Sequence, residues 1–485
     1  MKIGFISLPV PGHLNPMTAL ARELQSRNRD VVLISLPDTE PFVRNVARLP
    51  FIPCCEKEFP AGSTPEVVRQ MSRLQGQEAA EFVVRICAAI TSALLKSLPR
   101  LINSAGIDAL VLDTYQFYLE LVPIKLGIPY VHVSNALHFD YSGHTPLCIF
   151  DWPHETTPAA VARNRAGVAG FMELLKQASP AAGDYAKRAG IKMDWENYTT
   201  ISKLAWITQT PKEFDFASSH WPSQLHHTGP FLDGRGRENV EFPWERLTGE
   251  PLIYASMGTL QNGLPNVFRA IATAAANYQD MQLVLSIGNN LDPHQIGSLP
   301  SNAVVVKSAP QLELLKRASV CITHAGFNTV IESLANGVPQ VAIPITHDQP
   351  GVAARIADKK TGVFVPVTEL SASRLSLLLH EVLTDSIYRD NAQRFQKIIA
   401  GHNGSAAAGD VLEEAFGLTS RTGRSTQTNC RAPLSRWSRS NPPSIPIVSG
   451  PLGIGNPAQA AGHPSIKLTC SGSSSASLRS ATSNK

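Results

Sequence analysis

Short apolar runs alternate with segments of helical periodicity along most of the chain, and this alternation restricts the fold more than any other feature. Runs of this kind, bounded by turn residues, are typical of strands buried in a parallel sheet. The runs read "KIGFISL", "DVVLISL", "DALVL", "PYVHV", "PLIYAS", "QLVLSI", "AVVV", "SVCIT", "QVAIPI" and "GVFVPV". The pattern therefore predicts an α/β fold built from doubly wound parallel sheets.

The length and the turn residues divide the chain into parts. A chain of 485 residues exceeds what one hydrophobic core usually serves. The Pro- and Gly-punctuated segment 220–248 lacks a clear period and is the expected interdomain linker. We predict two facing Rossmann-like domains over 1–219 and 249–385, closing helices over 386–417, and a tail over 418–485. Each domain is expected to bind its ligand at the carboxyl ends of its strands.

The tail differs from the rest of the chain in composition and charge. It is rich in Pro, Gly and Ser without periodicity, so we expect it to be disordered. It carries eight Lys or Arg and no acid, whereas the remaining 35 basic and 39 acidic residues give the body a charge of −4. An acidic body argues against nucleic-acid binding. The tail is either a basic tether or an unselected extension, and its dispersed charges favour the second interpretation.

The composition and the first residues of the chain indicate the cellular compartment to expect. Hydrophobic residues at 43% and charged residues at 17% are typical of a soluble globular protein, and no apolar run of eighteen residues occurs. The start, "MKIGFISLPV", lacks a small-residue cleavage site, so we expect a cytoplasmic protein. Seven scattered cysteines without a C-x-x-C pair argue against disulfides and against a zinc site.

The stretch "SVCITHAGFNTVIESLANGVP" has the pattern of a strand that runs directly into a helix. The helix is expected to begin near Phe327, after His324 and Gly326, with free amides and a positive dipole that suit a diphosphate. Asn328 and Glu332 are four residues apart and share one face of this helix, where a carboxylate suits a ribose diol. An ordinary amphipathic helix with a polar wet face is the alternative.

A second strand end, "PLIYASMGTLQNG", carries small hydroxyls and glycine. Ser256, Gly258 and Thr259 could hold the same phosphates, although this signal is weak by itself. The chain contains neither G-x-x-x-x-G-K nor G-x-G-x-x-G, which removes the two commonest alternative nucleotide sites.

The stretches "APQLELL", "THAGFNTVIESLANGVP" and "HDQP", in this order and spacing, resemble the donor-binding signature of the UDP-glycosyltransferases. The similarity spans roughly residues 1–416. It is closest, in "YASMGTLQNG" and "DQPGVAARI", to bacterial zeaxanthin glucosyltransferase-like members. The resemblance implies an inverting enzyme of the GT-B fold, in which two Rossmann-like domains face each other across a cleft.

The resemblance also implies roles for the matching positions. The donor diphosphate would be held by Ser256, Gly258, Thr259, His324, Gly326, Asn328 and Thr329; the nucleoside by Ser308, Ala309, Gln311 and Glu332; and the sugar by Asp348 and Gln349. Ser308 stands where plant members carry a tryptophan that stacks on uracil, so the base is left open. The resemblance implies no cofactor besides the UDP-sugar co-substrate, and a D-x-D metal motif is absent.

The family further implies a base on the loop after the first strand, and this chain has His13 there, in "PVPGHLNP". The segment that follows predicts a helix with Asn15 as cap and Pro16 as its first residue. An imidazole can remove the acceptor proton if a partner orients it, and Asp113, which ends the strand "DALVLD", fits. Alone, Asp113 would be a turn or cap residue. No metal-binding spacing is found for His132, His138, His144, His226, His227 or His347.

These features predict transfer of a hexose from a UDP-sugar to a hydroxyl of a lipophilic small molecule such as a carotenoid, sterol, polyketide or flavonoid. Glucose is the first candidate for the hexose. The aromatic and apolar segments 51–63 and 138–155 either line the acceptor pocket or merely pack a loop. A lipophilic acceptor would suit peripheral membrane contact, but no amphipathic basic helix is evident. A GT-B sugar-nucleotide epimerase and a noncatalytic glycosyltransferase-like partner protein are the alternatives.

Overall fold

A computed structural model of the chain describes residues 1–194 and 200–418. Residues 1–421 form one compact unit that contains two parallel sheets, as the alternation of apolar runs predicts. The predicted disordered tail lies outside the described residues, apart from Leu418.

The first sheet has seven parallel strands in the order β3-β2-β1-β4-β5-β6-β7. The strands are β1 (Lys2–Ile6), β2 (Asp30–Ser35), β3 (Phe51–Pro53), β4 (Ala109–Asp113), β5 (Tyr130–Ser134), β6 (Trp206–Thr208) and β7 (Leu225–His227). The helices are α1 (Pro11–Ser26), α2 (Ser63–Met71), α3 (Gly76–Ala105), α4 (Leu121–Leu126), α5 (Pro158–Ala178) and α6 (Pro180–Ala189). The strand order reverses between β1 and β4, so a crevice is expected at the carboxyl ends of these two strands.

The second sheet has six parallel strands in the order β10-β9-β8-β11-β12-β13. The strands are β8 (Leu252–Ser256), β9 (Gln282–Ser286), β10 (Val304–Val306), β11 (Ala318–Thr323), β12 (Gln340–Ala342) and β13 (Gly362–Phe364). The helices are α7 (Pro265–Ala275), α8 (Gln311–Leu315), α9 (Phe327–Ala335), α10 (Gln349–Asp358), α11 (Ala372–Thr384), α12 (Ser386–Ala400) and α13 (Gly404–Ala415). Here the order reverses between β8 and β11, where Thr323 pairs with Ser256.

Helix α1 starts five residues earlier than the sequence predicts. Pro11 occupies its first position, where a missing N–H costs nothing, and Pro16 lies inside the helix. Pro16 cannot donate to the carbonyl of Gly12 four residues before it, so that carbonyl stays free for another donor. His13 therefore stands in the first turn of a helix and not on the loop before it.

The first sheet extends into the segment predicted as a linker. Strand β7 pairs in parallel with β6, although it lies within 220–248. Prolines and glycines on both sides of this three-residue strand mask it in the sequence. The crossing to the second sheet therefore begins after His227.

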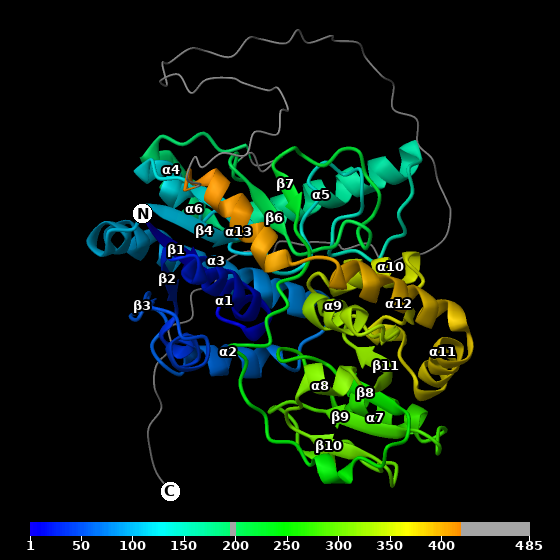
Figure 1. The fold of residues 1–485 in the computed structure, drawn as a ribbon. Helices are drawn as coiled ribbons and strands as arrows, with labels where there is room; N and C mark the ends of the chain where they lie inside the picture. Colours follow the sequence, from blue (N-terminus) through cyan, green and yellow to red (C-terminus); the bar gives the residue numbers. More distant parts are fainter. Residues whose placement is uncertain (195–199, 419–485) are drawn as a thin grey trace, which may run out of the picture. The chain divides into compact units, whose positions relative to one another are not determined.

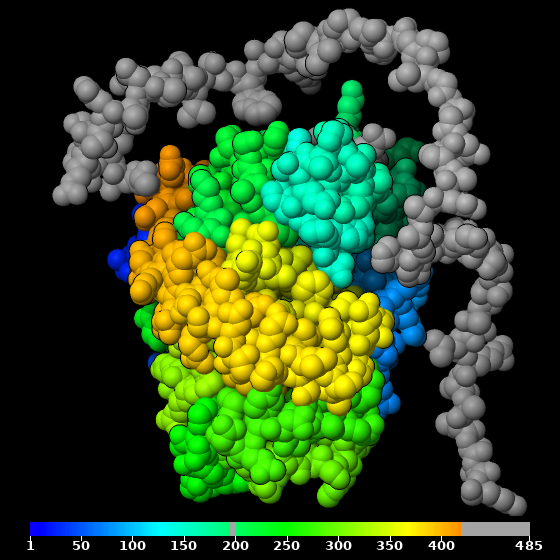
Figure 2. All heavy atoms as spheres, turned by 90° about the vertical axis from the view of Figure 1, so that its right-hand side faces the viewer, coloured from blue at the N-terminus to red at the C-terminus, as the bar shows by residue number. Residues whose placement is uncertain are grey.

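The closing helices connect both halves of the unit. In Figure 1, α13 lies beside α1 on the first sheet, although it follows α12 of the second half directly in the chain. Arg27, the residue after α1, binds Asp410 Oδ1 at 2.6 Å and Glu413 Oε2 at 2.9 Å. Figure 2 shows α10 to α12, in yellow and orange, as one continuous surface of the second half.

Helix α3 is the one helix in the described part of the chain that is long and apolar enough to cross a membrane, and a third of its most apolar window is buried. Leu94, Leu98 and Ile102 on α3 join the same hydrophobic cluster as Leu110 and Leu112 of β4. The core helix of a soluble protein passes the same length and composition test. These contacts make α3 a core helix of the first domain.

Candidate active site

A cavity of about 980 Å³ collects residues from the carboxyl ends of both sheets. His13 lines it, as do all the predicted diphosphate, nucleoside and sugar residues. Asp113 lies directly behind His13 and is fully buried. The structure thus brings together side chains that the sequence separates by more than three hundred positions.

His13 and Asp113 form a short pair at the end of adjacent strands. His13 Nδ1 lies 2.7 Å from Asp113 Oδ2. Since β1 and β4 pair side by side, the hundred residues between the two side chains do not separate them in space. Nδ1–H donates to the carboxylate, which leaves the lone pair of Nε2 available as a base.

The surroundings of Asp113 keep it ionised. Burial alone would raise its pKa, but His13, the Asn135 amide and the Tyr115 backbone N–H outweigh burial and lower the pKa. Asn135 Nδ2 donates to Oδ2 at 3.0 Å and the Tyr115 N–H donates to Oδ1 at 3.0 Å. Burial likewise disfavours the imidazolium of His13, yet Asp113 and, further away, Asp348 raise the pKa of His13 above 6.5.

His324 stands at the junction of β11 and α9, beside the glycine after β8. Burial lowers its pKa to about 4, so the ring is neutral at pH 7. Its Nδ1 has no partner among the described residues. Gly258 has a φ of +72°, and a Cβ there would lie 2.5 Å from the His324 ring. Both the positive φ and the close approach require glycine.

The start of α9 is free to bind an anion. Gly326 precedes the helix and no side chain caps its first amides. Asn328, in the first turn, donates through Nδ2 to Gly12 O at 2.6 Å, the carbonyl that Pro16 leaves free in α1. The first turn of α9 therefore faces the first turn of α1 and binds it directly.

The nucleoside end of the cavity is organised around Glu332. Gln311 Nε2 donates to Glu332 Oε2 at 2.6 Å, and Tyr254 Oη donates to Gln311 Oε1 at 3.1 Å. The Arg237 guanidinium binds the other oxygen of Glu332. Sequence reasoning missed Arg237 and Tyr254: Arg237 follows the first sheet in a segment without periodicity, and Tyr254 lies within a strand.

The remaining predicted donor residues differ in exposure. Ser308 and Thr259 are exposed and Ala309 is half-buried at the rim of the cavity. Thr329 is buried and its Oγ1 lies 3.3 Å from Gln311 Nε2. Ser308 thus presents only a small hydroxyl to a bound base.

The sugar residues are held from both domains. Asp348 Oδ2 accepts from the backbone N–H of Leu137 in the first domain at 2.9 Å, and burial raises the pKa of Asp348. Gln349 Oε1 accepts from the backbone N–H groups of Ile345 and Thr346 at 2.8 and 3.0 Å. The Gln349 side chain is therefore fixed by the loop before α10.

The apolar wall of the cavity comes mainly from α2 and α3. Its members there are Val67, Val68, Met71, Phe82, Val83, Ile86, Cys87 and Ile90. Of the two predicted acceptor segments, 51–63 contributes Phe59 and Ser63. In 138–155, Phe139, Leu147 and Cys148 belong to the hydrophobic core, and the described lining does not include that segment. The buried side chains of 138–155 thus favour packing of a loop over a direct contact with the acceptor.

Comparison with known proteins shows which proteins this chain is similar to. Residues 245–402 match the family model described as UDP-glucoronosyl and UDP-glucosyl transferase. The chain is 26% identical over 414 residues to a zeaxanthin glucosyltransferase of Pantoea ananas, an alignment that covers 85% of this chain and 95% of the relative. The chain is thus similar to UDP-glycosyltransferases, and the family model covers its residues 245–402.

A further relative and a solved structure are also similar to this chain. It is 27% identical over 422 residues to the demethyllactenocin mycarosyltransferase of Streptomyces fradiae, which covers 85% of this chain and 86% of the relative. The crystal structure of the glycotransferase of kitacinnamycin matches with a TM-score of 0.65 at 22% identity, over 86% of this chain and 98% of that one. The predicted GT-B fold is confirmed. The enzyme transfers a sugar from a nucleotide sugar to a small-molecule acceptor.

Proposed function

We propose that this glycosyltransferase moves a hexose from a UDP-sugar to a hydroxyl of a lipophilic small molecule, with inversion at the anomeric carbon. Glucose is the hexose proposed. The observation that carries the proposal is the 2.7 Å contact between His13 and Asp113, placed in the same cavity as the donor signature. A base oriented by a carboxylate beside a diphosphate-binding helix is the arrangement that direct displacement requires.

The proposed step is a single displacement. His13 Nε2 takes the proton of the acceptor hydroxyl while the hydroxyl oxygen forms a bond to the anomeric carbon. The bond from that carbon to the diphosphate oxygen breaks, and UDP leaves with the electron pair. Asp113 stabilises the imidazolium that forms on His13. The free amides of α9 and the neutral His324 ring stabilise the charge on the leaving diphosphate, so this step calls for no metal ion and no cofactor.

The acceptor class follows from the wall of the cavity. The side chains of α2 and α3 that line it are mostly apolar, which supports a carotenoid, sterol, polyketide or flavonoid acceptor. The names of the two relatives, with carotenoid and macrolide acceptors, support the same class. Uridine is the base proposed, because the rest of the family signature is retained around Ser308.

The test compares His13→Ala with His380→Gln, an exposed histidine on α11. Both variants and the wild type receive UDP-glucose with a panel of lipophilic alcohols, and mass spectrometry detects the glucosylated product. His13→Ala is expected to lose about 10²- to 10⁴-fold in kcat, the usual contribution of a general base. UDP is expected to stabilise all three proteins against heat, because the donor residues remain.

The outcomes separate the alternatives. If His13→Ala retained substantial transfer, His13 would not be the general base. If a thymidine or guanosine diphosphate stabilised the protein against heat more than UDP does, the donor would carry that nucleobase in place of uracil. The thermal stabilisation decides this because it reports affinity directly. Conversion of the UDP-sugar to an isomer without any acceptor would favour the epimerase.

A further inference from the structure

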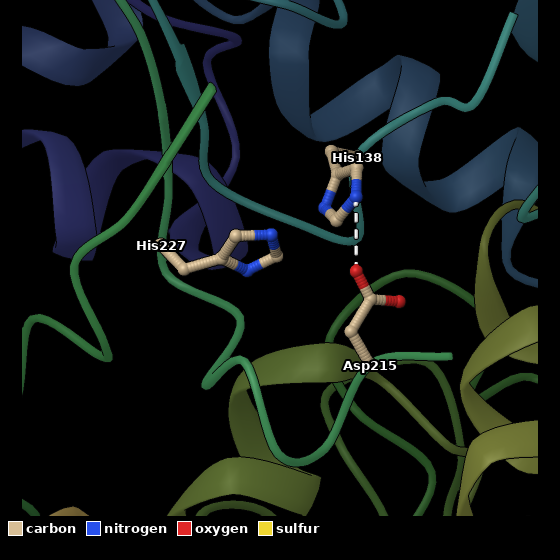
Figure 3. A group of neighbouring side chains, drawn as sticks. All are labelled: His138, Asp215 and His227. Carbon is tan, nitrogen blue, oxygen red and sulfur yellow. Dashed lines mark ion pairs between the residues drawn. The ribbon is translucent and has the colours of Figure 1, made fainter. Parts of the chain in front are cut away.

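We propose that His138, Asp215 and His227 bind a divalent transition-metal ion, Zn²⁺ by preference, at a site apart from the reaction cavity. One ligand atom from each residue lies within 4.8 Å of the other two. Figure 3 shows both imidazoles and the carboxylate turned toward a common space. The three residues come from the loop after β5, the segment after β6 and strand β7, which is why sequence spacing does not reveal the cluster.

The hydrogen bonds of the two rings leave their Nε2 atoms as acceptors. His227 Nδ1 donates to the carbonyl of Thr210 at 3.1 Å. His138 Nδ1 lies 3.2 Å from Thr208 Oγ1, and the Thr208 hydroxyl gives its own proton to Thr210 Oγ1. With the Thr208 proton on Thr210 Oγ1, His138 Nδ1 is the donor in its contact. In these tautomers both rings present an Nε2 lone pair, the form in which histidine binds metals.

The facing atoms have no other partner. His138 Nε2, His227 Nε2 and Asp215 Oδ2 are buried and make no hydrogen bond within the described residues. His138 Nε2 and Asp215 Oδ2 lie 3.2 Å apart, with side chains 0% and 1% exposed. In the tautomers given above these three buried atoms are all acceptors, which is unfavourable unless a cation or a donor lies between them.

The surrounding residues keep Asp215 Oδ2 available. Arg355 of α10 donates through Nε and Nη2 to the other oxygen, Oδ1, at 2.9 and 2.8 Å. The edges of Trp206 and Trp221 pack against the His138 ring and restrict access of water. Because Arg355 brings a positive charge to the only carboxylate of the cluster, we expect weaker affinity than at sites with more anionic ligands.

The donor set selects the kind of ion. Two imidazole nitrogens and one carboxylate oxygen suit Zn²⁺, whereas Ca²⁺ and Mg²⁺ prefer oxygen ligands alone. With bonds of about 2.0–2.2 Å in a tetrahedron, neighbouring ligand atoms would be roughly 3.4 Å apart. The His138–Asp215 pair, at 3.2 Å, is already close to this spacing, and the wider pairs, within 4.8 Å, would close by up to about 1.4 Å. Water would take the fourth position.

The ion would hold a junction between the domains and would touch no substrate. Leu137, next to His138, donates to Asp348, and Arg355 connects Asp215 to α10, the helix that begins at Gln349. The cluster thus lies between the acceptor domain and the residues assigned to the sugar. Its ligands are positioning residues for Asp348.

The test measures metal binding by the full chain after removal of any affinity tag and of metal by a chelator. A surface pair, His144 and His220, has stacked rings 3.4 Å apart and could bind metal adventitiously, so all proteins carry His144→Gln and His220→Gln. Calorimetry with ZnCl₂ should give one ion per chain. Saturating Zn²⁺ should raise Tm by roughly 3 °C, and CoCl₂ should give the intense visible absorption of a tetrahedral ion.

His227→Gln is compared with His226→Gln, which changes the neighbouring residue on the opposite face of β7. We expect His227→Gln to weaken Zn²⁺ binding at least 10-fold and to abolish the Tm shift, whereas His226→Gln retains both. Equal loss in the two variants, or no saturable binding by the parent protein, would overturn the site. If His227→Gln does not fold, the Co²⁺ spectrum of the parent decides, since an octahedral spectrum contradicts the proposed ligands.

Discussion

Three histidines line one cavity but differ in charge. Asp113 outweighs burial and raises the pKa of His13, whereas burial, without a carboxylate in contact, lowers the pKa values of His324 and His347 to about 4. The same imidazole chemistry therefore serves two purposes. One ring is able to take up a proton, and His324 stays neutral beside the expected diphosphate.

The raised pKa of His13 predicts the pH dependence of transfer. A base must be unprotonated to act, so kcat/KM should rise with pH and reach its plateau above pH 6.5, where His13 loses its proton. Asp113→Asn removes the charge that raises this pKa, so the rise should move to lower pH and kcat should fall by ~10³-fold or more. Rate profiles between pH 5 and 9 check both effects, with the exposed Asp151→Asn as control. An unshifted profile in Asp113→Asn would contradict the assigned pair.

At the scale of elements, α10 touches the loop 138–155 through its backbone. The N–H of Gly351 donates to Cys148 O at 2.9 Å, and a Cβ on Gly351 would lie 2.3 Å from that oxygen. Glycine is therefore required by the close approach of helix and loop. The contact fixes the helix that carries Asp348 and Gln349, the residues proposed to bind the sugar, at its start.

Gly351→Ala is expected to displace α10 from the loop. The overpacked contact should lower the free energy of unfolding by about 1–3 kcal/mol and raise the KM for the donor. Gly170→Ala on α5 is the matched control: no described atom lies within 4 Å of the new Cβ, so helix propensity should add up to about 1 kcal/mol. Urea unfolding followed by circular dichroism gives the energies, and steady-state kinetics give KM. If the donor KM of Gly351→Ala were unchanged, the contact between Gly351 and Cys148 would have no effect on sugar binding.

Apolar runs predict the long strands because both faces of a parallel sheet are buried, as in β4, whose five residues are all buried. They do not predict β7, a three-residue strand that ends in two histidines. The residues predicted to bind the donor lie in one cavity, and the sequence indicates them because strand-end and helix-start motifs are local in sequence. Arg237, the apolar wall of α2 and α3, and the cluster around Asp215 depend on packing between distant segments, which no local pattern records.

At the scale of the molecule, the last described helix completes the first domain. Ala408, Leu412 and Phe416 of the α13 region are buried in one cluster with Leu20 and Leu24 of α1. The chain therefore visits the second sheet and returns, so the first domain is finished only after the second has been synthesised.

Truncation tests this return of the chain. A chain that ends at residue 421 keeps the whole compact unit and should retain the stability and kcat of the full chain. A chain that ends at residue 402 lacks α13, and its free energy of unfolding should fall by more than ~3 kcal/mol, because loss of one large buried side chain already costs about 2–5 kcal/mol. Urea midpoints of the three proteins check this. Equal midpoints for the 402- and 421-residue chains would show that α13 adds no stability.

The bond from Asn328 to the carbonyl that Pro16 frees, and the bond from Leu137 to Asp348, both cross between the domains. Each joins a residue on the donor side to backbone on the acceptor side, so the two ligands share the free energy of one domain arrangement. Coupling between two ligands is reciprocal. If a bound acceptor changes the affinity for the nucleotide sugar by some factor, the bound nucleotide sugar changes the affinity for that acceptor by the same factor. If the two ligands are coupled through these bonds, acceptors should be ranked on the donor complex, because a ranking on the free protein leaves the coupling out.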